Sequence, residues 1–191
     1  MWMLNDQIAA RGLHTCPTNC TCDQLTACGE PYLPPQPPVA GATLAAATCT
    51  SPVEPAQAWS WDVSGDGALH VASNASLCVS LPSGGGVGTY PLAVAQCGGA
   101  ATLTWSRDAS TGHFATTVGG ESGVCLDLRT SDGAIGLYQC GSGGGLDQRN
   151  QGWAVDTMTG VVASMYGASG ASSGGATCVT AVNPAASALA A

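Results

Sequence analysis

The segment "QGWAVDTMTGVV", residues 151–162, places a tryptophan ahead of a turn glycine and an apolar residue, and the chain repeats this pattern twice more. The other versions are "QAWSWDVSGDGAL" at residues 57–69 and "LTWSRDASTGHF" at residues 103–114, so the tryptophans follow one another at 46 and 48 residues. Repetition at a fixed period indicates one supersecondary unit that is used several times. We therefore expect three related units of about 47 residues each.

Each unit also carries two short apolar segments that contain a cysteine. One segment precedes the tryptophan and ends in cysteine: "TLAAATC" to Cys49, "PLAVAQC" to Cys97 and "IGLYQC" to Cys140. The other segment follows the turn glycine and opens with cysteine: "LCVSL" at Cys78, "VCLDL" at Cys125 and "TCVTA" at Cys178. Short apolar runs bounded by glycine predict strands. The expected fold class is all-β, with three units of about four short strands.

The first unit lacks a cysteine-led segment ahead of Cys49, whereas the last unit has a surplus one at Cys178. We expect the C-terminal segment to complete the first unit in space and to bring the ends of the domain together. The repeat then predicts three disulfides: Cys78–Cys97, Cys125–Cys140 and Cys49–Cys178. Zinc binding by these cysteines is the weaker alternative, because the region has no close Cys-x-x-Cys pair.

Composition restricts the class of partner. The chain has 191 residues, a net charge of −8 and four basic residues, all arginine, so the basic surface that nucleic acid requires is missing. Ten cysteines in a Gly- and Ser-rich chain indicate disulfides and a secreted or extracellular location. The sequons at Asn19 and Asn74 predict glycosylation and agree with that location. No apolar run is long enough to span a bilayer.

We divide the chain into four parts. Residues 1–30 form a Cys-rich N-terminal segment, which resembles no signal peptide and is interpreted as the possible end of an upstream domain. Residues 31–38 are a Pro-rich linker, residues 39–183 the repeat domain, and residues 184–191 an Ala-rich tail. The N-terminal segment has an even set of cysteines, which most simply form two local disulfides in one of three connectivities: Cys16, Cys20, Cys22 and Cys28. Their spacing is unusual for a zinc site.

Two units keep a Gln-x-Trp motif, Gln57 with Trp59 and Gln151 with Trp153, whereas the middle unit has Leu103 in the glutamine position. With their "CLDL" and "YQC" segments, residues 39–183 resemble the ricin B-type lectin family of carbohydrate-binding domains. The resemblance implies a β-trefoil fold in which the three tryptophans belong to the core.

Strand alternation also suggests a candidate site in the third unit. If Cys125 lies opposite Cys140 in an antiparallel hairpin, then Asp127 and Tyr138 become cross-strand neighbours on the face away from the core. A carboxylate can bind two sugar hydroxyls, and an aromatic ring can cover the apolar face of a sugar. The resemblance implies the same two residues as sugar ligands, together with the amide of Asn150 and, in support, Gln151.

The other units lack these groups, so we expect one working site. At the positions of Asp127, Tyr138 and Asn150 the middle unit has Ser80, Ala95 and Thr102, and the first unit has Thr180, Ala47 and Ala56. The polar residue that the family places four residues before the second cysteine is replaced by Gly136. We expect millimolar to high micromolar affinity for a single sugar, because the pocket is shallow. The alternative is that Asp127 only caps a turn and Tyr138 only covers the hairpin.

No catalytic arrangement is visible, and we expect neither an enzyme nor a cofactor or metal site. The three histidines are not in a metal-ligand pair, and Asp66 with His70 is interpreted as surface decoration of a loop. The predicted function is a galactose-type carbohydrate-binding module, for which a plant or algal polysaccharide is also a candidate ligand. The module is expected to be appended to a secreted glycoside hydrolase. The alternatives are a non-binding structural trefoil that mediates protein–protein packing and, least favoured, a small hydrolase.

Overall fold

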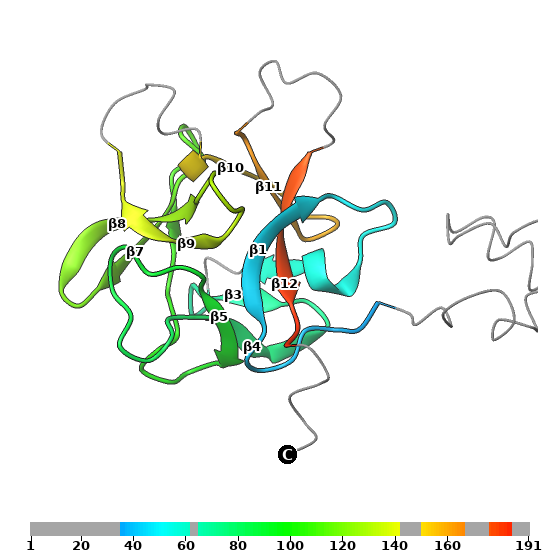
Figure 1. The fold of residues 1–191 in the computed structure, drawn as a ribbon, viewed down its shortest axis with the longest axis horizontal. Coiled ribbons are helices and arrows are strands. Elements are labelled where there is room, and N and C mark those ends of the chain that lie inside the picture. The colour runs from blue at the N-terminus through cyan, green and yellow to red at the C-terminus, as the bar shows by residue number, and fades with distance from the viewer. Residues whose placement is uncertain (1–34, 62–64, 142–149, 167–175, 185–191) are drawn as a thin grey trace, which may run out of the picture.

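The strands of the protein form two antiparallel sheets (Figure 1). The structure, a computed structural model, describes residues 35–61, 65–141, 150–166 and 176–184. Helical structure within these ranges is limited to 3-10 turns, η1 (Pro55–Gln57) and the residues Asn150 and Gln151. No helix in the same ranges is long and apolar enough to cross a membrane. The all-β prediction is therefore confirmed.

The two sheets differ in size. The larger sheet is curled and has eight strands, in the order β10 (Trp153–Asp156), β11 (Val161–Ser164), β12 (Thr177–Val182), β1 (Thr43–Thr48), β5 (Ala93–Gln96), β4 (Asn74–Ser80), β3 (Leu69–Val71) and β2 (Trp59–Trp61). The smaller sheet has four strands, β6 (Ser106–Arg107), β7 (Phe114–Val118), β8 (Glu121–Leu128) and β9 (Ile135–Gln139). Figure 1 shows β12, in red, beside β1, in blue, so the first and last strands are neighbours.

One hydrophobic core receives side chains from both sheets. The three tryptophans of the repeat lie in it, with exposed fractions of 4% for Trp59, 5% for Trp105 and 0% for Trp153. Phe114 meets Trp105 edge to face, with ring centroids 6.4 Å apart. The expectation that these tryptophans are core residues rather than surface platforms is confirmed.

Backbone hydrogen bonds connect the three units in a ring. Each tryptophan N–H donates to the carbonyl of a turn glycine in the preceding unit: Trp105 to Gly67 at 2.8 Å, Trp153 to Gly112 at 3.0 Å and Trp59 to Gly160 at 2.8 Å. The third bond runs from the first unit back to the last. The same hydrogen bond thus joins the first unit to the second, the second to the third, and the third back to the first.

The ends of the repeat domain meet, as the surplus C-terminal segment predicted. Strands β1 and β12 pair from Thr43 opposite Val182 to Thr48 opposite Thr177. Beyond this ladder the Asn183 side chain accepts the N–H of Val39 at 3.0 Å and donates to the carbonyl of Pro37 at 3.1 Å. Asn183 therefore binds one residue on each side of the predicted boundary between linker and repeat domain.

The disulfides predicted from the repeat are present: Cys49–Cys178, Cys78–Cys97 and Cys125–Cys140. The two cysteines of a disulfide do not lie directly opposite each other. Cys78 pairs with Ala95, Cys125 with Tyr138 and Cys178 with Ala47, and each of these partners lies two residues before the bonded cysteine. The N–H of Cys140 donates to the carbonyl of Gly123 at 2.8 Å. The cysteines of residues 1–30 and the Ala-rich tail after Pro184 lie outside the described residues.

Candidate functional site

Asp127 lies near the end of β8 and is the centre of a buried polar cluster. Its neighbours Leu126 and Leu128 are core residues, so strand alternation turns the aspartate side chain to the opposite side of β8. Other residues cover that side, so that only 4% of Asp127 is exposed to solvent. The prediction that this carboxylate faces solvent is therefore wrong.

Three side chains donate hydrogen bonds to the Asp127 carboxylate. Oδ2 accepts Nδ2 of Asn150 at 2.9 Å and Nε2 of Gln151 at 2.9 Å. Oδ1 accepts the phenol of Tyr90 in a short hydrogen bond. Asn150 Oδ1 is buried beside this cluster and has no hydrogen-bond partner among the described residues. The structure thus brings Asp127, Asn150 and Gln151 together, as predicted, but adds a tyrosine from elsewhere in the chain.

Tyr138 is not part of the cluster. The register of β8 and β9 places Asp127 opposite Gly136 and Tyr138 opposite Cys125, so the predicted cross-strand pair is two residues out of register. The prediction assumed that disulfide-linked cysteines lie directly opposite each other, whereas this disulfide joins diagonal positions. Tyr138 is 56% exposed and lies on the surface.

Tyr90 takes the place next to Asp127 because β9 has a glycine there. A Cβ atom on Gly136 would collide with the carbonyl of Thr89 and with the ring of Tyr90. Backbone hydrogen bonds between Leu137 N and Thr89 O at 3.0 Å and between Leu92 N and Ile135 O at 2.8 Å fix the segment around Tyr90 against β9. Sequence reasoning missed this residue, since Tyr90 belongs to the preceding unit; Gly136 was the available signal.

The surroundings keep the Tyr90 phenol protonated. Burial raises its pKa well above the ordinary value, and the hydrogen bond to Asp127 raises it further, so the hydroxyl acts as a donor. On the outer side the Arg129 guanidinium lies 4.7 Å from the ring centroid and also binds Asp132, with Nη2 and Oδ2 2.6 Å apart.

Gln151 has a structural role that Gln57 repeats in the first unit. The Gln151 side chain accepts the N–H of Gly141 at 3.0 Å and donates to the carbonyl of Gln139 at 3.0 Å. Gln57 accepts from Thr50 at 2.9 Å and donates to Thr48 at 2.9 Å. Both glutamines therefore bridge the residues on either side of a half-cystine. Each Nε2 also donates to the side chain at the equivalent strand position, Gln151 to Oδ2 of Asp127 at 2.9 Å and Gln57 to Oγ1 of Thr180 at 3.1 Å, so the two units differ in having a carboxylate or a hydroxyl there.

The sister positions have a hydroxyl group in place of the carboxylate. Ser80 and Thr180, which replace Asp127, bond back to their own strands, with hydroxyl to carbonyl distances of 3.2 Å to Cys78 and to Cys178. Among the described residues, a carboxylate at this position is thus found in the third unit alone. Of the sequon residues, Asn74 is exposed at the start of β4, while Asn19 lies outside the described residues.

Comparison with known proteins adds no relative. No family model, no curated protein and no solved structure matches this chain.

Proposed function

We propose that this protein is a carbohydrate-binding module with a β-trefoil fold of the ricin B type. The cyclic bonds between tryptophans and glycines, the three disulfides in equivalent positions and the pairing of first and last strands support a threefold architecture. The three disulfides also support the proposed extracellular location. The galactose preference and the association with a secreted glycoside hydrolase rest on the sequence resemblance alone.

The Asp127 cluster carries the proposal. Two amides hold one carboxylate oxygen, and the other oxygen accepts a neutral hydroxyl, which is the contact that a sugar hydroxyl makes. Asn150 Oδ1, which has no hydrogen-bond partner within the described part of the chain, provides a second acceptor in the same cluster. A ligand with two adjacent hydroxyls, as in galactose, satisfies both acceptors at once.

Tyr90 occupies the position of that sugar hydroxyl, so binding requires the tyrosine to leave. The backbone on both sides of Tyr90 is bonded to β9, and rotation of the side chain is the smaller change. Opening costs a hydrogen bond to a charged group, about 2 kcal/mol, which weakens the apparent affinity by roughly 30-fold. Tyr90, rather than the predicted Tyr138, is then the aromatic residue that controls the site.

Titration with galactose and N-acetylgalactosamine tests the proposal. Tyr90→Ala is expected to bind roughly 30-fold more tightly than the wild type, because the pocket no longer has to open. Tyr90→Phe is the matched control: it removes the hydroxyl, and with it the hydrogen bond that opening costs, but keeps the ring, so a gain close to that of Tyr90→Ala is expected if the hydrogen bond sets the penalty. Adding Asp127→Asn to Tyr90→Ala should abolish binding, with circular dichroism used to verify the fold.

The second candidate is a non-binding structural module, and the burial of Asp127 favours it. With 4% exposure and three donors from its own chain, the carboxylate joins the second and third units without any ligand. If neither the wild type nor Tyr90→Ala binds any glycan on an array, this candidate replaces the first.

A further inference from the structure

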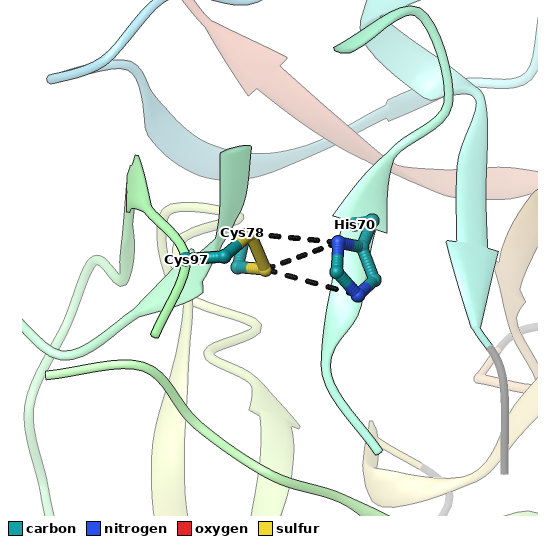
Figure 2. A group of neighbouring side chains, drawn as sticks. All are labelled: His70, Cys78 and Cys97. Carbon is teal, nitrogen blue, oxygen red and sulfur yellow. Dashed lines mark hydrogen bonds between the residues drawn. A yellow bond between two sulfur atoms is a disulfide. The ribbon is translucent and has the colours of Figure 1, made fainter. Parts of the chain in front are cut away.

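His70 lies in the middle of β3, and its ring contacts the Cys78–Cys97 disulfide (Figure 2). The Nδ1 atom is 3.3 Å from Sγ of Cys78 and 3.4 Å from Sγ of Cys97. The interpretation of His70 as loop decoration is therefore wrong, because it pairs with Cys78 in the β3–β4 ladder.

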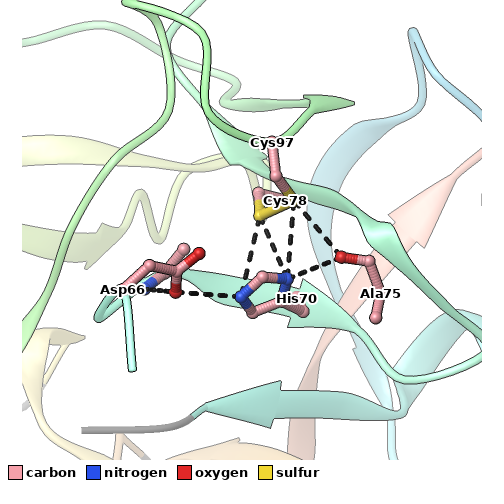
Figure 3. Close-up of polar contacts among 6 residues, drawn as sticks. Asp66, His70, Ala75, Cys78 and Cys97 are labelled. Carbon is pink, nitrogen blue, oxygen red and sulfur yellow. Dashed lines mark hydrogen bonds and ion pairs between the residues drawn. A yellow bond between two sulfur atoms is a disulfide. The ribbon is translucent and has the colours of Figure 1, made fainter. Parts of the chain in front are cut away.

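Two oxygen acceptors also face the imidazole, one at each nitrogen (Figure 3). Nε2 is 3.0 Å from Oδ1 of Asp66, and Nδ1 is 2.8 Å from the carbonyl oxygen of Ala75. The N–H of Ala68 and, next, His70 lower the pKa of Asp66, so this oxygen belongs to a carboxylate. A ring with a proton on both nitrogens satisfies both acceptors, and that ring is positively charged.

The other two units provide an internal comparison, since each has a strand residue paired with the buried cysteine of its disulfide. This strand residue is His70 opposite Cys78 in the first unit, and it is alanine in the other two, Ala115 opposite Cys125 and Ala163 opposite Cys178. Only the first of these side chains can reach the sulfur atoms with a nitrogen.

The carboxylate partner is likewise found in one unit. Asp66 precedes the turn glycine, where the other units have Thr111 and Thr159. The cysteines themselves are buried to a similar degree in the three units, because each disulfide joins a buried cysteine to one of intermediate exposure. The imidazole and its carboxylate are thus what distinguishes the Cys78–Cys97 disulfide.

We propose that Cys78–Cys97 is a thiol-exchange site that reacts with small thiols of the glutathione class. The thiolate of the small molecule attacks Sγ of Cys97, the less buried residue of the pair, and forms a mixed disulfide. The bond to Cys78 breaks, and Cys78 leaves as a thiolate. A second thiol of the same class then releases Cys97 and departs as the small-molecule disulfide, so these two thiols supply both electrons.

In its protonated form the His70 imidazole accelerates the first step. A positive charge beside a sulfur stabilises its thiolate, and a disulfide opens faster when the departing thiolate is more stable. His70 Nδ1 lies next to both sulfurs and can donate its proton to Cys78 after the bond has broken. Asp66 is a positioning residue, since it contacts the ring and not the disulfide.

The test treats the full chain with reduced glutathione at neutral pH under native conditions, followed by alkylation and peptide mass mapping. Cys78–Cys97 should open at least about tenfold faster than Cys125–Cys140 in the same molecule, with the glutathione adduct on Cys97. In His70→Ala, which introduces the residue of the other units, this advantage should disappear. Asp66→Asn should give an intermediate rate.

Two further results decide between this chemistry and simple loosening of the fold. Loss of packing in His70→Ala would speed exchange by local opening, whereas the proposal requires it to slow. Ala115→His combined with Thr111→Asp should accelerate opening of Cys125–Cys140. Equal opening rates of the two disulfides in the wild type, or an unchanged rate in a folded His70→Ala variant, would overturn the proposal.

Discussion

At the residue scale, one missing side chain determines the composition of the candidate site. Gly136 leaves room above β9, and Tyr90 fills it and reaches Asp127. Gly41 serves a different purpose, because its backbone has a φ of 90° and nothing lies within 4 Å of a Cβ atom placed there. Glycine thus allows Tyr90 to lie close to the backbone at position 136 and allows a left-handed backbone conformation at position 41.

We expect Gly136→Ala to destabilise the protein by about 1–3 kcal/mol, because the new methyl group must displace the Thr89 backbone or the Tyr90 ring. Gly41→Ala should cost about 1 kcal/mol through backbone strain alone. Urea denaturation of the oxidised proteins measures both values. Only Gly136→Ala should also alter the environment of Tyr90, and an unchanged Tyr90 environment in this variant would contradict the proposed close contact.

At the scale of elements, aspartates fix the turns of the hairpins. In the β6–β7 hairpin Asp108 accepts the N–H of Ser110 at 2.8 Å and its hydroxyl at 2.7 Å. In the β10–β11 hairpin Asp156 accepts the N–H of Met158 at 2.9 Å and the hydroxyl of Thr159 at 2.7 Å. These equivalent turns explain why an acidic residue follows the tryptophan segment in the second and third units.

The hydrogen bonds of Ser110 lower the pKa of Asp108 to about 2. A lowered pKa means that Asp108 stabilises the folded state above about pH 4, and that this contribution is lost as the pH falls towards 2. Asp108→Asn keeps a side-chain acceptor but cannot titrate. Thermal melts between pH 6 and pH 2 should therefore show a smaller fall in Tm for Asp108→Asn than for the wild type; parallel curves would exclude this role.

At the scale of the whole molecule, closure of the ring is the main constraint. The Cys49–Cys178 disulfide joins residues 129 apart in sequence and holds β1 against β12, whereas Cys125–Cys140 spans 15 residues within one hairpin. Both sit in equivalent positions of their units. They differ chiefly in how much of the unfolded chain they restrict.

Replacing Cys49 and Cys178 by serine is expected to cost about 4–5 kcal/mol, against about 3 kcal/mol for the same change at Cys125 and Cys140. The difference follows from the larger loop that the first disulfide closes. Urea denaturation of the two double variants gives the comparison. Equal losses would show that native-state contacts, and not chain entropy, dominate the effect.

The repeat made the larger features predictable. Cysteines and tryptophans recur at one period, so the strand segments, the disulfide partners and the return of the C-terminal strand to β1 followed from counting. The register of β8 and β9 was wrong by two residues, because a disulfide between antiparallel strands can join directly opposite or diagonal positions. Sequence spacing does not distinguish these geometries.

The sequence by itself determined the all-β class and the three disulfides, because both follow from the short apolar segments and the spacing of the cysteines in the repeat. The gathering of Asp127, Asn150 and Gln151 was what the resemblance to the ricin B-type family implied. Only the tertiary structure decided that Tyr90 covers the carboxylate and that His70 lies against a disulfide. The Tyr90 contact joins different units. The His70 contact depends on how the β3–β4 ladder orients an imidazole, and the distance between two side chains is set by packing that the periodic pattern does not encode.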